Sequence, residues 1–188
     1  MRRLTVFNQV TVDGYFAAAN GDLSWAHKDT EDAEWNAFVA ANASAGGTLV
    51  FGRITYELMA SYWPTPNALE NAPIVAERMN NLPKIVFSRT LDRASWNNTT
   101  LVKSDMASEV RKMKKAPGDD MAILGSGSIV SQLAQDRLID EFQIVVNPVV
   151  LGVGRTMFDG VKAKLSLKLT KTRPFPNGNV LLCYEPMT

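Results

Sequence analysis

The feature that most constrains the fold is an alternation of short apolar runs with amphipathic segments of helical period. Strand-like runs are expected at 48–51, 84–87, 100–102 and 121–124, and helical patterns follow the first, third and fourth of them. In the helix after the first run, Ile54, Leu58 and Tyr62 recur every four residues as an apolar stripe. Strands that alternate with helices favour a mostly parallel sheet with helices on both faces. The sequence therefore predicts an α/β fold.

Both ends of the chain add strands to this pattern. Arg3 to Val10 is rich in β-forming residues, and Ile139 to Val146 forms a longer strand. Leucines alternate with polar residues over 165–170, and an Asn-Gly turn at 177–178 leads back into 180–184, which predicts a C-terminal antiparallel hairpin. We expect residues 1–188 to form one domain, since no linker or repeat interrupts the pattern.

Two further segments are less regular. A helix is expected from Asp32 onward, with Trp35, Phe38, Val39 and Ala45 on one face. The stretch from Pro64 to Pro83, which contains several prolines, is expected to form an irregular loop on the surface.

Composition excludes several classes of function. The net charge is +1, and no basic block or tail is present, so neither a nucleic-acid nor an anionic-membrane partner is expected. The single cysteine, Cys183, cannot form an internal disulfide, and the single histidine, His27, rules out a His-rich zinc site, so no metal is expected. No signal peptide or transmembrane run is recognisable, which predicts a cytoplasmic protein.

Three junctions that follow predicted strands carry residues suited to phosphates. The first contains Gly52, Arg53 and Thr55 at a helix start; the second is Ser88-Arg89; the third is the run Gly125-Ser126-Gly127-Ser128 before a helix. Ligands of α/β sheets bind beyond the carboxyl ends of the strands, where helix N-termini offer unpaired N–H groups. Taken alone, the first could equally be a tight turn with its arginine in solvent, and the second is better explained as an exposed polar turn.

The third junction differs from the two familiar phosphate loops. No Gly-Lys-Ser/Thr follows it, so it is not a Walker A motif, and Val130 breaks the G-x-G-x-x-G pattern. A small-residue turn between a buried strand and an amphipathic helix still suits a pyrophosphate.

Five segments in this order resemble the dihydrofolate reductase superfamily, and most closely its branch that contains the reductase domain of bacterial riboflavin biosynthesis. They are Val12–Ala17, Gly52–Glu57, Val86–Leu91, Ile123–Ser128 and Pro148–Arg155. The resemblance spans residues 3–184. It implies a mixed sheet of about eight strands that is mostly parallel, flanked by helices and extended by the C-terminal hairpin.

The resemblance also implies roles for individual residues, with NADPH as the cofactor. Gly52, Arg53 and Thr55 would contact the cofactor phosphates, and the turn Gly125 to Ser128 would hold the pyrophosphate. Ser88 and Arg89 would read the 2′-phosphate of the adenosine ribose. Asp13 and Gly14 would lie near the nicotinamide.

The substrate side is defined less sharply. Folate enzymes of this superfamily carry an acidic residue at the start of their first long helix, and Asp32 is the candidate here, although its spacing from Trp25 differs. Asp32 could donate a proton or cap the helix, and Asp13 could be catalytic or initiate the Asp-Gly turn. Trp25 is a candidate substrate contact.

These observations predict an NADPH-dependent reductase of a small heterocyclic or carbonyl-bearing molecule, resembling pterins, flavin precursors or aminopyrimidines. The alternative is an NADP-binding protein without catalysis. A hydrolase using Ser126 or Ser128 is disfavoured, because no G-x-S-x-G elbow exists and only His27 could be its base. We also expect a homodimer, with contacts in the C-terminal sheet region around Val145 to Gly154.

Overall fold

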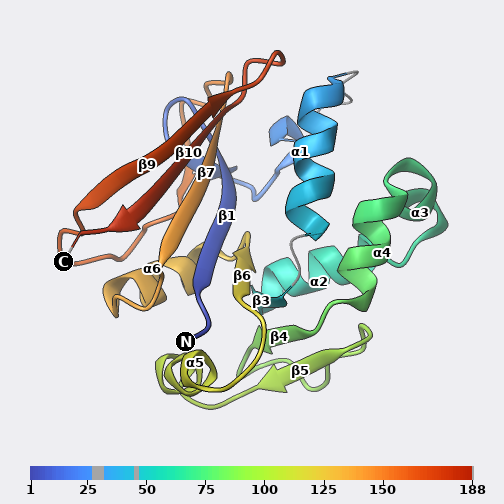
Figure 1. Ribbon diagram of the computed structural model, residues 1–188, viewed down its shortest axis with the longest axis vertical. Helices are drawn as coiled ribbons and strands as arrows, with labels where there is room; N and C mark the ends of the chain where they lie inside the picture. The colour runs from blue at the N-terminus through green and yellow to red at the C-terminus, as the bar shows by residue number, and fades with distance from the viewer. Residues whose placement is uncertain (27–31, 45–46, 188) are drawn as a thin grey trace.

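The computed structural model describes residues 1–26, 32–44 and 47–187, and its centre is one eight-stranded sheet (Figure 1). The strand order is β5-β4-β3-β6-β1-β7-β10-β9. The first six strands in that order run parallel, and β10 and β9 join antiparallel at the edge beside β7. The predicted mostly parallel α/β sheet with a C-terminal antiparallel hairpin is confirmed. Its strands are β1 (Leu4–Thr11), β3 (Thr48–Gly52), β4 (Lys84–Phe87), β5 (Thr99–Val102), β6 (Met121–Leu124), β7 (Glu141–Asn147), β9 (Leu167–Pro174) and β10 (Val180–Pro186).

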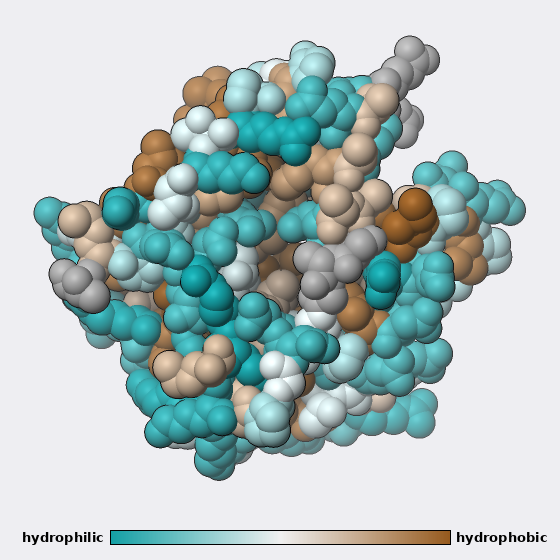
Figure 2. Space-filling model, in the orientation of Figure 1, coloured by the Kyte–Doolittle hydropathy of each residue, from teal (hydrophilic) through white to brown (hydrophobic). Residues whose placement is uncertain are grey.

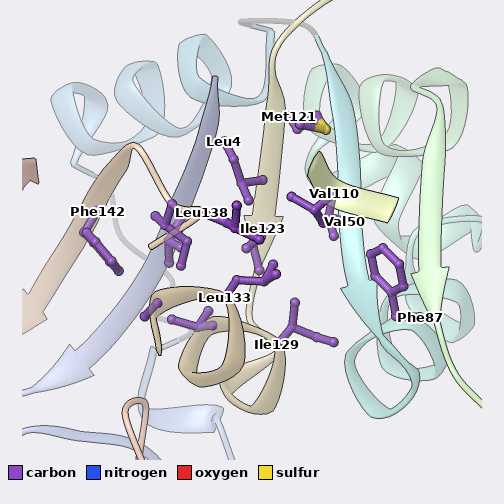
Figure 3. Close-up of a cluster of buried hydrophobic side chains, with 14 of the residues drawn as sticks. Leu4, Val50, Phe87, Val110, Met121, Ile123, Ile129, Leu133, Leu138 and Phe142 are labelled. Atoms are coloured by element: carbon purple, nitrogen blue, oxygen red, sulfur yellow. The ribbon is translucent and has the colours of Figure 1, made fainter. Parts of the chain in front are cut away.

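Helices cover both faces of this sheet because side chains of each buried strand alternate between two apolar layers. Val50 of β3 joins a core with the inner faces of the helices α5 and α6, while its neighbours Leu49 and Phe51 pack with residues of α2 and α4. Figure 3 shows the first layer, where Ile129 and Leu133 of α6 meet Ile123 of β6. The helices are α1 (Ala33–Ser44), α2 (Arg53–Tyr62), α3 (Pro66–Asn71), α4 (Pro73–Asn81), α5 (Met106–Lys115) and α6 (Gly127–Gln135).

A third apolar cluster fixes α1 over the hairpin end of the sheet. Trp35 is buried there with Val145, Phe175 and Leu181, and Phe38 packs against them. The Trp35 and Phe175 rings meet edge to face with centroids 5.0 Å apart. The expected inner face of this helix is therefore confirmed for Trp35, Phe38 and Val39, and Ala45 lies outside the described residues.

A second, two-stranded sheet was not anticipated from the sequence. It pairs β2 (Tyr15–Ala18) with β8 (Gly154–Thr156) in antiparallel fashion. The two strands lie 136 or more residues apart along the chain, so no local sequence pattern predicts their pairing. This small sheet holds the loop after β7 against the loop after β1.

One expectation about the first half of the chain is wrong. The stretch from Pro64 to Pro83 is not irregular, because it forms α3 and α4. Pro66 and Pro73 occupy the first positions of those helices, where the missing N–H costs nothing. The stripe on α2 does not face the core: Ile54 is 68% exposed, and the helix buries Tyr56 instead.

Lys84 is a buried charge at the start of β4. Its ammonium donates to the backbone oxygens of Asn80 and Leu82 at 3.0 and 2.7 Å, and it lies 4.5 Å from the ring centroid of Trp96. Those carbonyls belong to the end of α4, so the lysine caps this helix. Burial lowers the pKa of Lys84 to about 8.

No helix within residues 1–26, 32–44 and 47–187 is long and apolar enough to cross a membrane.

Gly47 is expected to be intolerant of substitution at the entrance to β3. Its φ is +103°, and an added Cβ would lie 2.2 Å from the backbone oxygen of Asp120, which also accepts the N–H of Thr48 at 2.9 Å. Gly47→Ala should therefore lower the free energy of unfolding by about 3 kcal/mol or more, measured by urea denaturation. Gly21→Ala is the control, because Gly21 has a similar φ of +87° and nothing within 4 Å of its added Cβ. It should lose only about 1–2 kcal/mol, and equal losses would show that crowding is unimportant at Gly47.

Candidate functional site

The first and third predicted junctions meet directly at the carboxyl ends of β3 and β6. The backbone N–H of Gly52 donates to Ser126 Oγ at 2.9 Å, and the N–H of Ser126 donates to Thr55 Oγ1 at 2.9 Å. Ser126 Oγ in turn donates to the carbonyl of Leu124 at 3.1 Å. Residues more than 70 positions apart thus form one reciprocal hydrogen-bonded unit, which we call the Ser126–Thr55 lock.

The lock depends on a backbone shape that few residues adopt. Gly125 and Ser126 both have left-handed conformations, with φ of +59° and +57°. A Cβ on Gly125 would lie 2.7 Å from Thr55 Cγ2, so glycine is required there. Asn8 Nδ2 secures the turn from β1 by donating to the Gly125 carbonyl at 2.9 Å.

The lock sets the N-termini of α2 and α6 side by side. The first N–H groups of a helix have no partner within the helix, and the helix dipole adds positive potential at that end. Arg53 begins α2, while Gly127 and Ser128 begin α6. Two such N-termini at one edge can bind neighbouring anionic groups, as a pyrophosphate requires.

The lock also changes what the predicted side chains can do. Ser126 is 5% exposed, and its hydroxyl is engaged with the protein through both Gly52 and Leu124. Thr55 accepts one bond and retains a hydroxyl proton that it can donate to a ligand. The Ser128 side chain is exposed at the start of α6. Gly52 allows close packing, since an added Cβ would lie 3.0 Å from the Ile129 side chain.

The second junction faces the start of α2 across an open hollow. This hollow has a volume of about 570 Å³ and is lined by Arg53, Glu57 and the loop from Thr90 to Arg93. Ser88 supports that loop, because its hydroxyl accepts the N–H groups of Thr90 and Leu91 at 3.2 and 2.9 Å. Ser88 is therefore a turn-forming residue in this structure.

The charges around the hollow are mixed. Arg53 pairs with Glu57 of its own helix at 2.9 Å, which leaves Arg93 as the second cation of the lining beside Asp92. Arg89 is exposed, and its charge contributes to a lowered pKa of Asp105, after the larger effect of the Ser108 hydrogen bonds. Sequence reasoning missed Arg93, because only the folded loop shows that it faces α2.

Asp13 holds the small second sheet in place. Its carboxylate accepts the Thr11 hydroxyl at 2.5 Å and the backbone N–H groups of Leu151 and Gly152 at 3.1 and 2.7 Å. The Thr11 hydrogen bond and then these backbone bonds lower the pKa of Asp13. Gly14, with φ of +85°, allows the chain to reverse after β1. Of the two roles left open for Asp13, these contacts favour the turn.

Asp32 caps α1 and connects it to the hairpin. Its Oδ1 accepts the N–H groups of Glu34 and Trp35, both at 3.0 Å, and its Oδ2 accepts the N–H of Asn177 at 3.0 Å. Of the two roles left open for Asp32, these contacts favour the cap. The bond to Asn177 is a tertiary contact that the sequence did not reveal.

Phe16 of β2 and Trp25 are aromatic residues of the segment that follows β1. Trp25 lies in η1 (Ser24–Ala26) before α1, and its buried indole Nε1 has no hydrogen-bond partner among the described residues. The ring of Phe16 lies 3.4 Å from the position of a Cβ on Gly127, so it adjoins the start of α6. His27 lies outside the described residues. Within those residues, no cluster of three or more His, Cys, Asp or Glu side chains could hold a metal ion.

The sheet order, the hairpin and the paired helix N-termini define a protein of the dihydrofolate reductase-like class. Residues 2–181 match the model of the RibD C-terminal domain. The chain belongs to that family, which confirms the resemblance found in its sequence motifs.

Similar proteins agree with this assignment. The chain is 31% identical to the uncharacterised protein YyaP of Bacillus subtilis over 98% of this chain and 95% of that protein. Its fold is similar to a protein assigned to riboflavin biosynthesis from Shewanella sp. PV-4, with a TM-score of 0.76, 22% identity and 99% of both chains covered. It is also similar to Enterococcus faecalis dihydrofolate reductase complexed with NADP(H), with a TM-score of 0.63, 14% identity, and 99% and 97% of the two chains covered.

The Ser126–Thr55 lock makes a prediction about stability. Ser126→Ala leaves the buried N–H of Gly52 without an acceptor, so the free energy of unfolding should fall by about 1–3 kcal/mol in urea denaturation. Ser128→Ala is the matched control on the same turn, because its side chain is exposed, and it should change stability by less than about 0.5 kcal/mol. Equal stability of the two variants would mean that the lock does not hold the helix N-termini together.

Proposed function

We propose that this protein is an NADPH-dependent reductase of a small heterocyclic or carbonyl-bearing molecule. The observation that carries the proposal is the pair of helix N-termini fixed at the carboxyl edge of β3 and β6 by the Ser126–Thr55 lock. Family membership supports a reductase-like activity. The cofactor identity rests on the charges near this edge and on the resemblance.

The residues present fit a dinucleotide phosphate. The N–H groups that begin α2 and α6, together with the Thr55 hydroxyl, would bind the pyrophosphate. Arg93 and Arg89 would bind the 2′-phosphate beside the hollow, since a guanidinium presents a planar fork of donors to a phosphate. Arg53 would contribute less charge, because Glu57 already neutralises it.

The substrate side would use the small second sheet and the start of α1. A bound NADPH supplies the hydride, and the protein must position the ring and exclude water. Asp13 would position the loop around Gly152 by accepting its N–H. A proton delivered to the reduced product would come through water, since the carboxylates of Asp13 and Asp32 both accept hydrogen bonds from the protein.

One observation favours a second candidate function, an NADP-binding protein without catalysis. Both candidate proton donors, Asp13 and Asp32, are engaged in structural hydrogen bonds. The two functions share the cofactor site and differ in whether NADPH is oxidised by any acceptor. Spectroscopic assay of NADPH with pterins, flavins and aminopyrimidine ribotides separates them.

The expected homodimer stays a prediction, with contacts near the loop after β7. Val150 and Val153 are 70% and 65% exposed, and Val12 is 62% exposed. These valines are therefore not internal core, which supports the proposal of a subunit contact there.

The proposed reader of the 2′-phosphate can be tested by cofactor titration. Arg93→Ala should weaken NADPH binding by about 1–3 kcal/mol and leave NADH binding nearly unchanged, because only NADPH carries that phosphate. Arg89→Ala should act in the same direction. Arg78→Ala on α4 is the control, since Arg78 is exposed outside the hollow. Equal weakening of NADPH and NADH would remove both arginines from 2′-phosphate recognition.

The role of Asp32 can be tested with Asp32→Asn. The asparagine still caps α1 but places an NH₂ group opposite the N–H of Asn177, so we expect a loss of about 1–3 kcal/mol in the free energy of unfolding. NADPH affinity and the turnover of an accepted substrate should change less than about threefold, because the proton comes through water. If turnover instead falls by about two orders of magnitude while NADPH affinity is unchanged, Asp32 is the proton donor.

A further inference from the structure

The first turn of α2 has an unusual distribution of charge. A helix N-terminus favours acidic side chains, because the helix dipole places positive potential there. In α2 the first residue is Arg53, and the first turn contains no acidic side chain. The arginine adds its charge to the positive potential of the N–H groups that begin the helix. This arrangement is unfavourable unless an anion lies against it.

In the structure the anion beside Arg53 is the carboxylate of Glu57. Nη1 of Arg53 donates to Oε2 of Glu57 at 2.9 Å. The two side chains are 43% and 47% exposed, and both line the hollow between α2 and the loop 90–93. An exposed ion pair at this helical spacing changes an equilibrium only about twofold. A ligand can therefore open the pair easily, and the pair does little to hold Arg53 in one position.

The charges that line the hollow cancel. The lining has two cations, Arg53 and Arg93, and two carboxylates, Glu57 and Asp92. A phosphate monoester such as the 2′-phosphate of NADPH carries about two negative charges. The guanidinium groups attract it and the carboxylates repel it, whereas the uncharged 2′-hydroxyl of NADH is not repelled. The acidic residues of the hollow therefore act on the difference in affinity between the two cofactors.

Glu57 is directed at the hollow and not at the pyrophosphate. In the proposed site the pyrophosphate lies against Thr55 and the N–H groups that begin α2 and α6. Glu57 follows Thr55 by two positions, and residues with that spacing lie on different sides of a helix. Glu57 and Arg53 are four positions apart and share the side that lines the hollow.

We propose that Glu57 is a specificity-determining residue that limits the preference of the site for NADPH over NADH. The inference rests on the proposed function. One charge and a doubly charged phosphate about 6 Å apart in water repel each other by enough to change a binding constant about tenfold, and salt reduces this effect. Repulsion of this size exceeds the about twofold effect of the ion pair on Arg53. Glu57 thus opposes a preference that Arg93 and Arg89 create.

Cofactor titration tests the sign of this effect. Dissociation constants of NADPH and NADH are measured by cofactor fluorescence in about 0.01 M salt, where screening is weak. Glu57→Gln should bind NADPH about fivefold tighter than the wild type, and NADH less than about twofold tighter. The gain should shrink in about 0.15 M salt. If Glu57→Gln binds NADPH as the wild type does, or more weakly, the carboxylate does not limit phosphate binding and the proposal is wrong.

A conservative variant separates the charge of Glu57 from its pairing with Arg53. Glu57→Asp keeps the negative charge but shortens the side chain that reaches the guanidinium. It should retain the wild-type ratio of NADPH to NADH affinity within about twofold. If it behaves as Glu57→Gln does, the geometry of the ion pair sets the preference, which overturns the proposal.

Glu185→Gln is the matched control for the net charge of the protein. Glu185 pairs with Arg3 at 2.8 Å, is 45% exposed and lies in β10 outside the hollow. This variant should bind both cofactors as the wild type does. A gain in NADPH affinity equal to that of Glu57→Gln would show that net charge, and not the position of Glu57, controls binding.

The titrations also distinguish this inference from the proposed function. If the wild type binds neither cofactor, the proposed function fails and this inference fails with it. If the wild type binds both and Glu57→Gln leaves the ratio of their affinities unchanged, only the inference fails. Because Glu57 is exposed, neither substitution should lower Tm by more than about 2 °C, and thermal unfolding checks that each variant is folded.

Discussion

The candidate site depends on the reciprocal hydrogen bonds between Ser126, Thr55 and Gly52. Neither α2 nor α6 has a side-chain cap of its own, since the residues before them are Gly52 and the left-handed Ser126. The two helix starts instead stabilise each other across the sheet. Because the N–H of Gly52 is satisfied by Ser126, and that of Ser126 by Thr55, the N–H groups that follow remain available at one edge.

The acidic residues near the candidate site are likewise engaged in hydrogen bonds within the protein. Asp13 and Asp32 are the catalytic candidates of the sequence, yet each carboxylate accepts a backbone N–H from a distant loop. Carboxylates bind such donors strongly because the bond is charge-assisted. These residues therefore position the loops around the site.

Much of the fold could be predicted because the period of the apolar pattern is a local property. The runs at 48–51 and 121–124 are too short for helices and lie between helical patterns, which identifies buried parallel strands. The period does not show which side of a helix is buried: on α2 the residues Ile54, Leu58 and Tyr62 are exposed and Tyr56 is buried. Periodicity shows that a helix has an apolar stripe, but neighbouring elements decide which side is buried.

In Figure 2 apolar surface is also visible over α3 and α4, where Leu69 and Ile74 are exposed.

The sequence by itself determined the α/β class, the family and the three polar junctions that follow strands, because strand period, turn glycines and motif order are properties of consecutive residues. Only the tertiary structure decided which polar groups remain free to bind a ligand. Ser126, Thr55, Asp13 and Asp32 all have chemistry suited to a site, but each is engaged by a partner from a distant segment. Arg93 carried no local signal. Hydrogen bonds and burial depend on three-dimensional proximity, which residue order alone does not express.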